Sequence, residues 1–109
     1  QIKKKSKRKS YVRSAYFEKD KIFLDTFWQT LFRKQNWRDR VRRVKYFPAA
    51  IELIERSRCE PQSKENPNRA RELLHRFTGI TPDRAIFHIH IKEDKRTGKK
   101  WLISIFPET

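Results

Sequence analysis

Two runs near the end of the chain alternate apolar and polar residues, and this alternation restricts the fold more than any other feature. Residues 85–93 read AIFHIHIKE and residues 99–106 read KKWLISIF. A period of two places successive side chains on opposite faces of a strand. The segment between the runs ends in Gly98, which can adopt the positive φ that hairpin turns require. The pattern predicts an antiparallel hairpin with one apolar face.

A third strand is predicted upstream of this hairpin. Residues 73–79 read LLHRFTG, and Thr81-Pro82-Asp83-Arg84 forms a plausible turn after them. Together the three runs predict a three-stranded antiparallel meander. Residues 59–68, CEPQSKENPN, are rich in proline and asparagine and are predicted to be a loop.

The first half of the chain has helical rather than alternating periodicity. Phe23, Phe27 and Leu31 recur at every fourth position and predict a helix over 20–35, with Asp20 as its cap. A short, very basic helix is predicted over 36–46, with Val41 and Val44 facing inward. Pro48 suits the first position of a further helix over 49–58.

These elements predict a single α+β domain over residues 11–109. Its N-terminal helices pack on one face of a small C-terminal antiparallel sheet, which is a three-strand meander or slightly more. Residues 1–10 read QIKKKSKRKS, in which six of ten residues are Lys or Arg. Such a segment repels itself and has little to bury, so a disordered basic arm is expected.

The charge of the chain indicates a polyanionic partner. Lys and Arg number 28 against 13 Asp and Glu, which makes the net charge +15. RNA is the first candidate partner and DNA the second, and the alternative is a merely solubilising surface. No segment is apolar enough to cross a membrane. Cys59 is the only cysteine, so neither an intrachain disulfide nor a cysteine metal cage can form.

The start of the chain and its cysteine usage bear on its origin. The chain contains no methionine and begins Gln1-Ile2-Lys3. We therefore expect either a processed N-terminus or a domain of a larger protein. A lone cysteine fits a reducing compartment, so a cytoplasmic location is expected.

Strand parity predicts which side chains share a face. Phe87, Ile89 and Ile91 should lie together, and so should Trp101, Ile103 and Ile105. His75 has the parity of the apolar face, although a bulge would move it. When the apolar faces are paired, one predicted open face remains, and it bears Arg76, Thr78, His88, His90, Lys92, Lys100 and Ser104.

Such a face has the groups that RNA cleavage without a metal requires. A base must take the proton of the 2′-hydroxyl, an acid must protonate the leaving oxygen, and cations must stabilise the phosphorane. Histidine suits the proton transfers because its pKa lies near neutrality. No carboxylate cluster is evident, so neither a metal nor another cofactor is expected. Two alternatives are ordinary solvent-exposed side chains and a His88-x-His90 metal pair that would need His75 as its third ligand.

The stretch from Tyr46 to Pro107 resembles a known ribonuclease group. Its segments FPAAIELI, HRFTGIT and IFHIHIKEDKRTGKKWLISIFP are similar to small domains of the barnase/EndoU/colicin/RelE-like superfamily, which occur in toxins and phage-encoded nucleases. The resemblance implies helices before a short antiparallel sheet and metal-free cleavage of RNA. It also implies an inhibitor or immunity protein as a further partner. The catalytic positions it suggests are His75, Arg76, His90, Lys92 and Ser104.

The sequence therefore predicts a metal-independent endoribonuclease of toxin or mobile-element type. His90 is the expected general acid or base, with His75 as the alternate. Lys92, Arg76 and Lys100 would stabilise the phosphorane, and Ser104 would orient the phosphate. The RNA backbone would be held by Arg38, Arg42, Arg43, Lys45, Lys95, Arg96, Lys99 and Lys100.

Two rival functions remain open at this stage. One is a non-catalytic RNA- or DNA-binding module, or an accessory subunit of a nucleoprotein complex. The other is a domain that docks on an acidic protein.

Overall fold

The computed structural model describes residues 11–33, 41 and 43–108, and its main feature is one six-stranded sheet. The strands are β1 (Tyr11–Ser14), β2 (Asp20–Phe23), β3 (Gln62–Asn66), β4 (Arg69–Ile80), β5 (Ile86–Asp94) and β6 (Lys100–Pro107). The helices with defined bounds are α2 (Asp25–Arg33) and α4 (Phe47–Arg56). The strand order is β1-β2-β6-β5-β4-β3, in which β2 and β6 run parallel and all other neighbours antiparallel.

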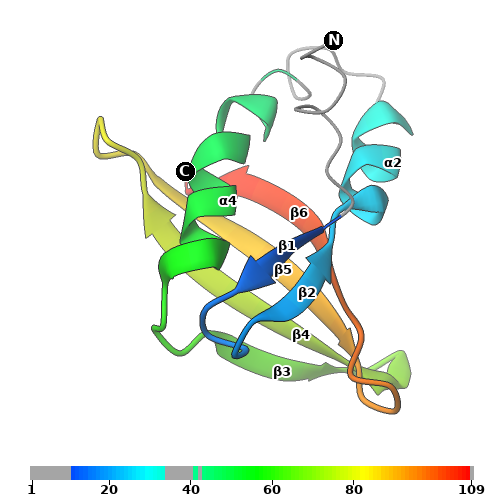
Figure 1. Cartoon of the computed structure of the whole chain (residues 1–109). Coiled ribbons are helices and arrows are strands. Elements are labelled where there is room, and N and C mark those ends of the chain that lie inside the picture. The colour runs from blue at the N-terminus through cyan, green and yellow to red at the C-terminus, as the bar shows by residue number, and fades with distance from the viewer. Residues whose placement is uncertain (1–10, 34–40, 42, 109) are drawn as a thin grey trace, which may run out of the picture.

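The sheet curls so that its two ends approach each other. Figure 1 shows β1 and β2 passing in front of β4 and β5, with the helices on the same side. The turn between β1 and β2 packs against β4: the ring of Tyr16 lies 5.8 Å from Phe77, and the ring of Phe17 lies 5.1 Å from His75. The sheet therefore has an inner face around the core and an outer face, which we call the open face.

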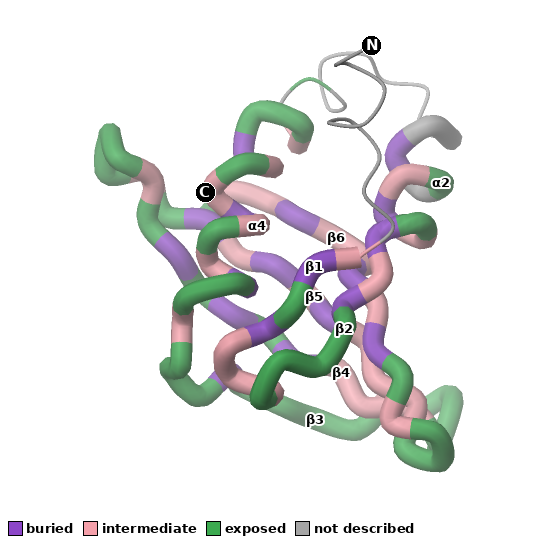
Figure 2. The backbone as a smooth tube through the Cα atoms, in the orientation of Figure 1, coloured by how far each residue is buried: buried purple, intermediate pink, exposed green. Residues whose placement is uncertain are grey.

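The core fills the space between the inner face and the helices. Figure 2 shows buried residues running along the central strands beneath α2 and α4. Phe27 of α2 and Ile54 of α4 are buried against the sheet, and the ring of Phe27 stacks on Phe47 at 5.7 Å. Phe87, Ile89 and Ile91 of β5 are also buried, which confirms the parity predicted for that strand.

The predicted fold class is wrong, because the sheet rather than the helices dominates the molecule. The described residues form six strands where a three-strand meander or slightly more was expected, and their helices are few and short. The predicted loop 59–68 contains β3, an exposed edge strand that is held by pairing with β4 and buries little of its polar sequence. The strands β1 and β2 are too short for their alternation to stand out.

The helix predictions have mixed outcomes. Residues 20–23 form β2 rather than the first turn of a helix, and α2 begins at Asp25. The helix predicted from Pro48 is confirmed as α4, with Pro48 in its first turn. Of the basic helix predicted over 36–46, residues 41 and 43–45 are helical and the others lie outside the described residues or in the turn at Tyr46. Val41 and Val44 are exposed instead of facing inward.

A β-bulge in β6 changes the faces predicted for that strand. His90 pairs with Ser104, but the next residue, Ile91, pairs with Leu102, so Ile103 is an extra residue without a partner in β5. Leu102 and Ile105 consequently both face the core and are fully buried. The prediction that Trp101 and Ile103 share the core face with Ile105 is therefore wrong.

Gly98 has a positive φ of 77°, as predicted for the turn between β5 and β6.

None of the helices in the described part of the chain is both long and apolar enough to span a membrane.

Candidate active site on the open sheet face

Three neighbouring strands bring Arg76, His90 and Ser104 into one row on the open face. Arg76 of β4 pairs with His90 of β5, and His90 pairs with Ser104 of β6. Residues directly opposite each other in antiparallel strands have Cβ atoms about 4.5–5.5 Å apart. A guanidinium, an imidazole and a hydroxyl therefore lie within reach of one small group bound over β5.

The ring of His90 is poised to accept a proton. It is half-buried, and no hydrogen bond from any described residue occupies its ring nitrogens. Burial, followed by the positive charge of Arg76 and smaller contributions from His88 and Lys64, lowers the pKa of His90 below its ordinary 6.5. These surroundings therefore favour the neutral imidazole, which is the form that can act as a base.

The next row, toward the turn between β4 and β5, contains a second histidine whose two ring nitrogens both have hydrogen-bond partners. His88 lies between Thr78 and Phe106, with Thr78 Oγ1 2.9 Å from its Nδ1. Its Nε2 lies 2.8 Å from Oε1 of Glu108. Because a carboxylate only accepts hydrogen bonds, Nε2 of His88 carries a proton.

Phe106 lies beside the two rows on the same face, where it pairs with His88. Its ring lies 5.0 Å from the His90 ring, 5.4 Å from the His88 ring and 5.9 Å from the Arg76 guanidinium. The aromatic ring restricts the positions that the two imidazoles and the guanidinium can take. The site thus has one aromatic ring next to its polar groups.

The surface is hollowed beside this group. A hollow of about 200 Å³ is lined by Gln62, Ser63, Lys64, Leu74, Arg76 and His90. A neighbouring hollow of about 460 Å³ is lined by Arg69, Ala70, Arg71, Glu72, Lys92, Asp94 and Trp101. Lys92 therefore lies on the open face as predicted, where its Nζ is 4.0 Å from Glu72 Oε2.

Two of the predicted catalytic groups lie elsewhere. His75 and Lys100 are only 6% and 5% exposed, on the inner face. Strand parity predicted this position for His75. On the inner face it lies away from Arg76, His90 and Ser104, so the catalytic role that the resemblance implies for it is not supported. Lys100 was expected on the open face, and the bulge at Ile103 explains the error, because parity counted back from Ser104 fails at that residue.

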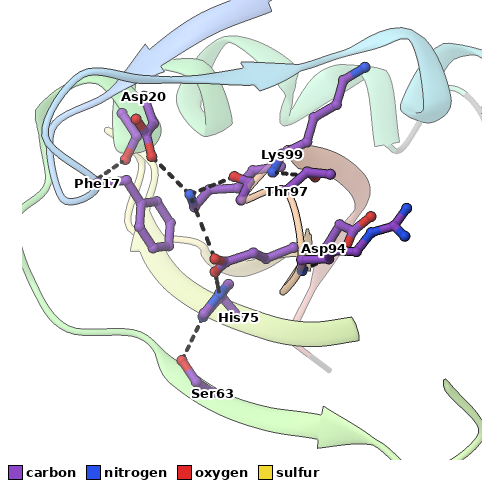
Figure 3. A network of polar contacts seen from close by, with 12 residues as sticks. Phe17, Asp20, Ser63, His75, Asp94, Thr97 and Lys99 are labelled. Atoms are coloured by element: carbon purple, nitrogen blue, oxygen red, sulfur yellow. Dashed lines mark hydrogen bonds and ion pairs between the residues drawn. The ribbon is translucent and has the colours of Figure 1, made fainter. Parts of the chain in front are cut away.

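Instead, His75 and Lys100 belong to a buried polar network, which Figure 3 shows in close-up. The Nδ1 of His75 lies 2.6 Å from the Ser63 hydroxyl and its Nε2 lies 2.8 Å from Glu93 Oε1. The Nζ of Lys100 lies 2.8 Å from Asp20 Oδ2 and 3.8 Å from Glu93 Oε2. This network joins β2, β3, β4, β5 and β6 and stabilises the curl of the sheet.

The arrangement also bears on the metal alternative. His88 and His90 lie on the open face while His75 lies on the inner face, so the three rings do not converge. Across the residues that the structure describes, no group of three or more His, Cys, Asp or Glu side chains could hold a metal ion.

The predicted backbone-binding residues are scattered. Arg38 and Arg42 lie outside the described residues. Arg43 donates a hydrogen bond of 2.6 Å to the carbonyl of Ile105, and Lys45 lies 6.0 Å from the ring of Tyr46, which packs against Phe87 in the core. Both of them thus lie on the helix side of the sheet.

The predicted RNA-binding residues in and beside the turn between β5 and β6 differ in their surroundings. Lys95 pairs with Glu65 at 3.2 Å, and Arg96 is exposed in the turn. Lys99 lies over the rings of Phe23 and Trp101 on the open face. Among the described members of this set, Lys99 is the one that extends the basic surface along the face that carries His90.

Sequence reasoning did not find the aromatic residues of the open face. Phe106 was assigned no role, Trp101 was expected to be buried, and Tyr11 and Phe23 were not assigned to strands. Their exposure depends on the pairing of β2 with β1 and with the distant β6, which a local sequence pattern does not show.

The chain matches no family model, no curated protein and no solved structure.

Proposed function

We propose that this chain is a metal-independent endoribonuclease whose active site is the row of Arg76, His90 and Ser104. The observation that carries the proposal is an imidazole, free of hydrogen bonds from the described residues, directly between a guanidinium and a hydroxyl on a sheet face that α2 and α4 leave uncovered. A net charge of +15 supports a polyanionic substrate.

The proposed reaction uses the substrate's own 2′-hydroxyl as the nucleophile. His90 takes the proton of this hydroxyl as its oxygen bonds to the adjacent phosphorus. Arg76 stabilises the negative charge of the phosphorane, and the Ser104 hydroxyl donates a hydrogen bond to a phosphate oxygen. The bond from phosphorus to the 5′-oxygen then breaks.

His88 is the proposed acid for the leaving oxygen. It lies two residues from His90 along the same face of β5, a separation of about 7 Å. This separation places an acid and a base on either side of one phosphate. The products are a 2′,3′-cyclic phosphate and a free 5′-hydroxyl.

The test uses an end-labelled single-stranded RNA, the same sequence in DNA, and EDTA in both reactions. RNA should be cut to products with a 2′,3′-cyclic phosphate, and DNA should stay intact because it lacks the nucleophile. Replacing His90 by Ala should slow cleavage about 10²–10⁴-fold, the usual contribution of one general base. Arg76→Ala should cause a loss of about 10²–10³-fold.

Arg56→Ala provides the matched control, since Arg56 is an exposed arginine of α4 on the helix side. Its rate should equal that of the wild type. Binding of RNA without cleavage by the wild type would refute the enzyme and favour a nucleic-acid-binding module. Cleavage of DNA, or full activity in both site variants, would refute the mechanism.

A further inference from the structure

A row of aromatic side chains crosses the open face beside the candidate active site. Tyr11 pairs with Phe23 across β1 and β2, and Phe23 pairs with Trp101 across β2 and β6. The residues that alternate with them, Val12 and Ile22, are buried in the core. The three rings are only partly buried and therefore lie side by side on the open face, which α2 and α4 leave uncovered. We call Tyr11, Phe23 and Trp101 the aromatic track.

Lysine ammonium groups lie over every ring of the aromatic track. Their distances to the ring centroids are 4.8 Å for Lys21 over Tyr11, 4.9 Å for Lys99 over Phe23 and 5.0 Å for Lys92 over Trp101. Within the described ranges, neither Lys21 nor Lys99 forms an ion pair with a carboxylate. The surface thus alternates flat π-faces with cations, of which Lys92 alone has a nearby carboxylate, that of Glu72.

The aromatic track is continuous with the row that contains His90. Trp101 pairs with Lys92 of β5, and Lys92 lies two residues from His90 on the same face. This spacing corresponds to about 7 Å along the strand. A strand of RNA whose phosphate lies at His90 therefore reaches the aromatic track within its neighbouring nucleotides.

We propose that the aromatic track stacks unpaired bases of RNA while its lysines contact the phosphates, so that the substrate is single-stranded. The assignment of the bound strand as a substrate rests on the proposed function. Aromatic side chains on a sheet stack two or three bases in RNA-binding domains, and they do so with little dependence on sequence. A duplex hides its base faces and cannot use these rings.

The lysines now over the rings do not prevent stacking. An exposed cation–π contact is weaker than the stacking of a base on the same ring. An arriving base therefore takes the ring face, and the flexible ammonium group moves to the phosphate of the same nucleotide. The charge of the surface favours a polyanion over an apolar protein partner.

The experiment measures binding separately from cleavage. The probes are a labelled oligothymidylate of twelve nucleotides, which lacks 2′-hydroxyl groups, and a DNA duplex of the same length. Trp101→Leu and Phe23→Leu should each weaken binding of the single strand about tenfold, which is within the range for one lost base stack. Binding of the duplex should be unchanged in both variants.

Two further variants control for folding and for apolar surface. Trp101→Phe keeps a ring and should bind the single strand with near wild-type affinity, and it should lose most of the tryptophan fluorescence quenching seen on binding. Ile80→Ala removes an apolar side chain that is 64% exposed at the other end of the open face, and its affinity should not change.

Each outcome bears on one proposal at a time. Unchanged affinity of the folded Trp101→Leu and Phe23→Leu variants, or binding without quenching, would overturn the aromatic track. Equal weakening of single-strand and duplex binding would also overturn it. Track-dependent binding by a chain that cuts no RNA would instead refute the proposed ribonuclease and leave the aromatic track in place.

Discussion

The ring of His90 owes its properties to its surroundings on the open face. Burial and the neighbouring charge of Arg76 disfavour the imidazolium and lower the pKa of His90 below 6.5. An imidazole at the surface, without these neighbours, would be partly protonated near neutrality. The difference matters because only the neutral ring can accept a proton.

We predict an acidic limb in the pH profile of cleavage that reports this titration. If His90 is the base, kcat/KM rises with pH through the pKa of the folded protein, so the midpoint of the rise lies below pH 6.5. Lys64→Gln removes one of the charges that lower this pKa, so the midpoint should move to higher pH. Rate measurements from pH 4.5 to 8 test both statements. A midpoint that does not move in Lys64→Gln, or one above 6.5 in the wild type, would argue against His90 as the base.

Lys100 provides a second prediction at the level of single residues. Its buried ammonium lies between the carboxylates of Asp20 and Glu93, so Lys100→Met leaves their charges uncompensated. The free energy of unfolding should fall by about 2–4 kcal/mol, somewhat less than for a fully buried pair, because Asp20 is half exposed.

The matched control for Lys100 is Lys95→Met. Its ion pair with Glu65 is exposed to solvent, so its loss should cost about 0–1 kcal/mol. Denaturant titrations of both variants make the comparison. Equal stability of the two would mean that the buried network contributes nothing.

At the level of elements, the bulge in β6 is one extra residue in an otherwise regularly alternating strand. Removing Ile103 would leave Leu102 and Ile105 on the inner face and Ser104 on the open face, now in regular alternation. The bulge is therefore an addition to the strand that adds local twist rather than a change in the facing of its other residues.

We predict that a chain lacking Ile103 still folds cooperatively. A chain lacking Arg76 should not, because β4 and β5 pair without a bulge from Glu72 to Ile80. There, one deleted residue turns either His75 or Phe77 to the wrong face. Circular dichroism during thermal unfolding distinguishes the two results. A cooperative transition in the Arg76 deletion would contradict the register.

At the scale of the whole molecule, charge is unevenly distributed along the chain. Six of the 28 Lys and Arg residues fall within residues 1–10, which lie outside the described residues. The folded part retains a large positive surplus without them.

We predict that deletion of residues 1–10 weakens RNA binding without lowering stability. Each lost contact with a phosphate should reduce the slope of log K against log salt by about 0.7 for a single strand. The unfolding temperature should not change, because so polar a segment has little to bury. Salt titrations of the full and shortened chains test the first point and thermal melts the second. An identical salt slope would exclude contact between this segment and RNA.

Local patterns in the sequence were sufficient to predict the elements whose own residues follow a regular period. The alternation of 85–93 predicted β5 and its buried residues, and Pro48 predicted the start of α4. Parity also placed Arg76, His90 and Lys92 on one face, because these residues lie in regular stretches of β4 and β5. In such stretches the facing of each side chain depends only on its neighbours in the chain.

Only the tertiary structure decided the features that depend on pairing between distant segments. The strands β1, β2 and β3 form because neighbouring strands satisfy their backbone hydrogen bonds, while their own sequences are short or polar. The bulge at Ile103 is the reason why sequence parity misplaced Trp101 and Lys100, since one extra residue reverses the parity expected for everything before it. The free energy of strand pairing comes from contacts between segments that are far apart in sequence, so it cannot be predicted from a local pattern.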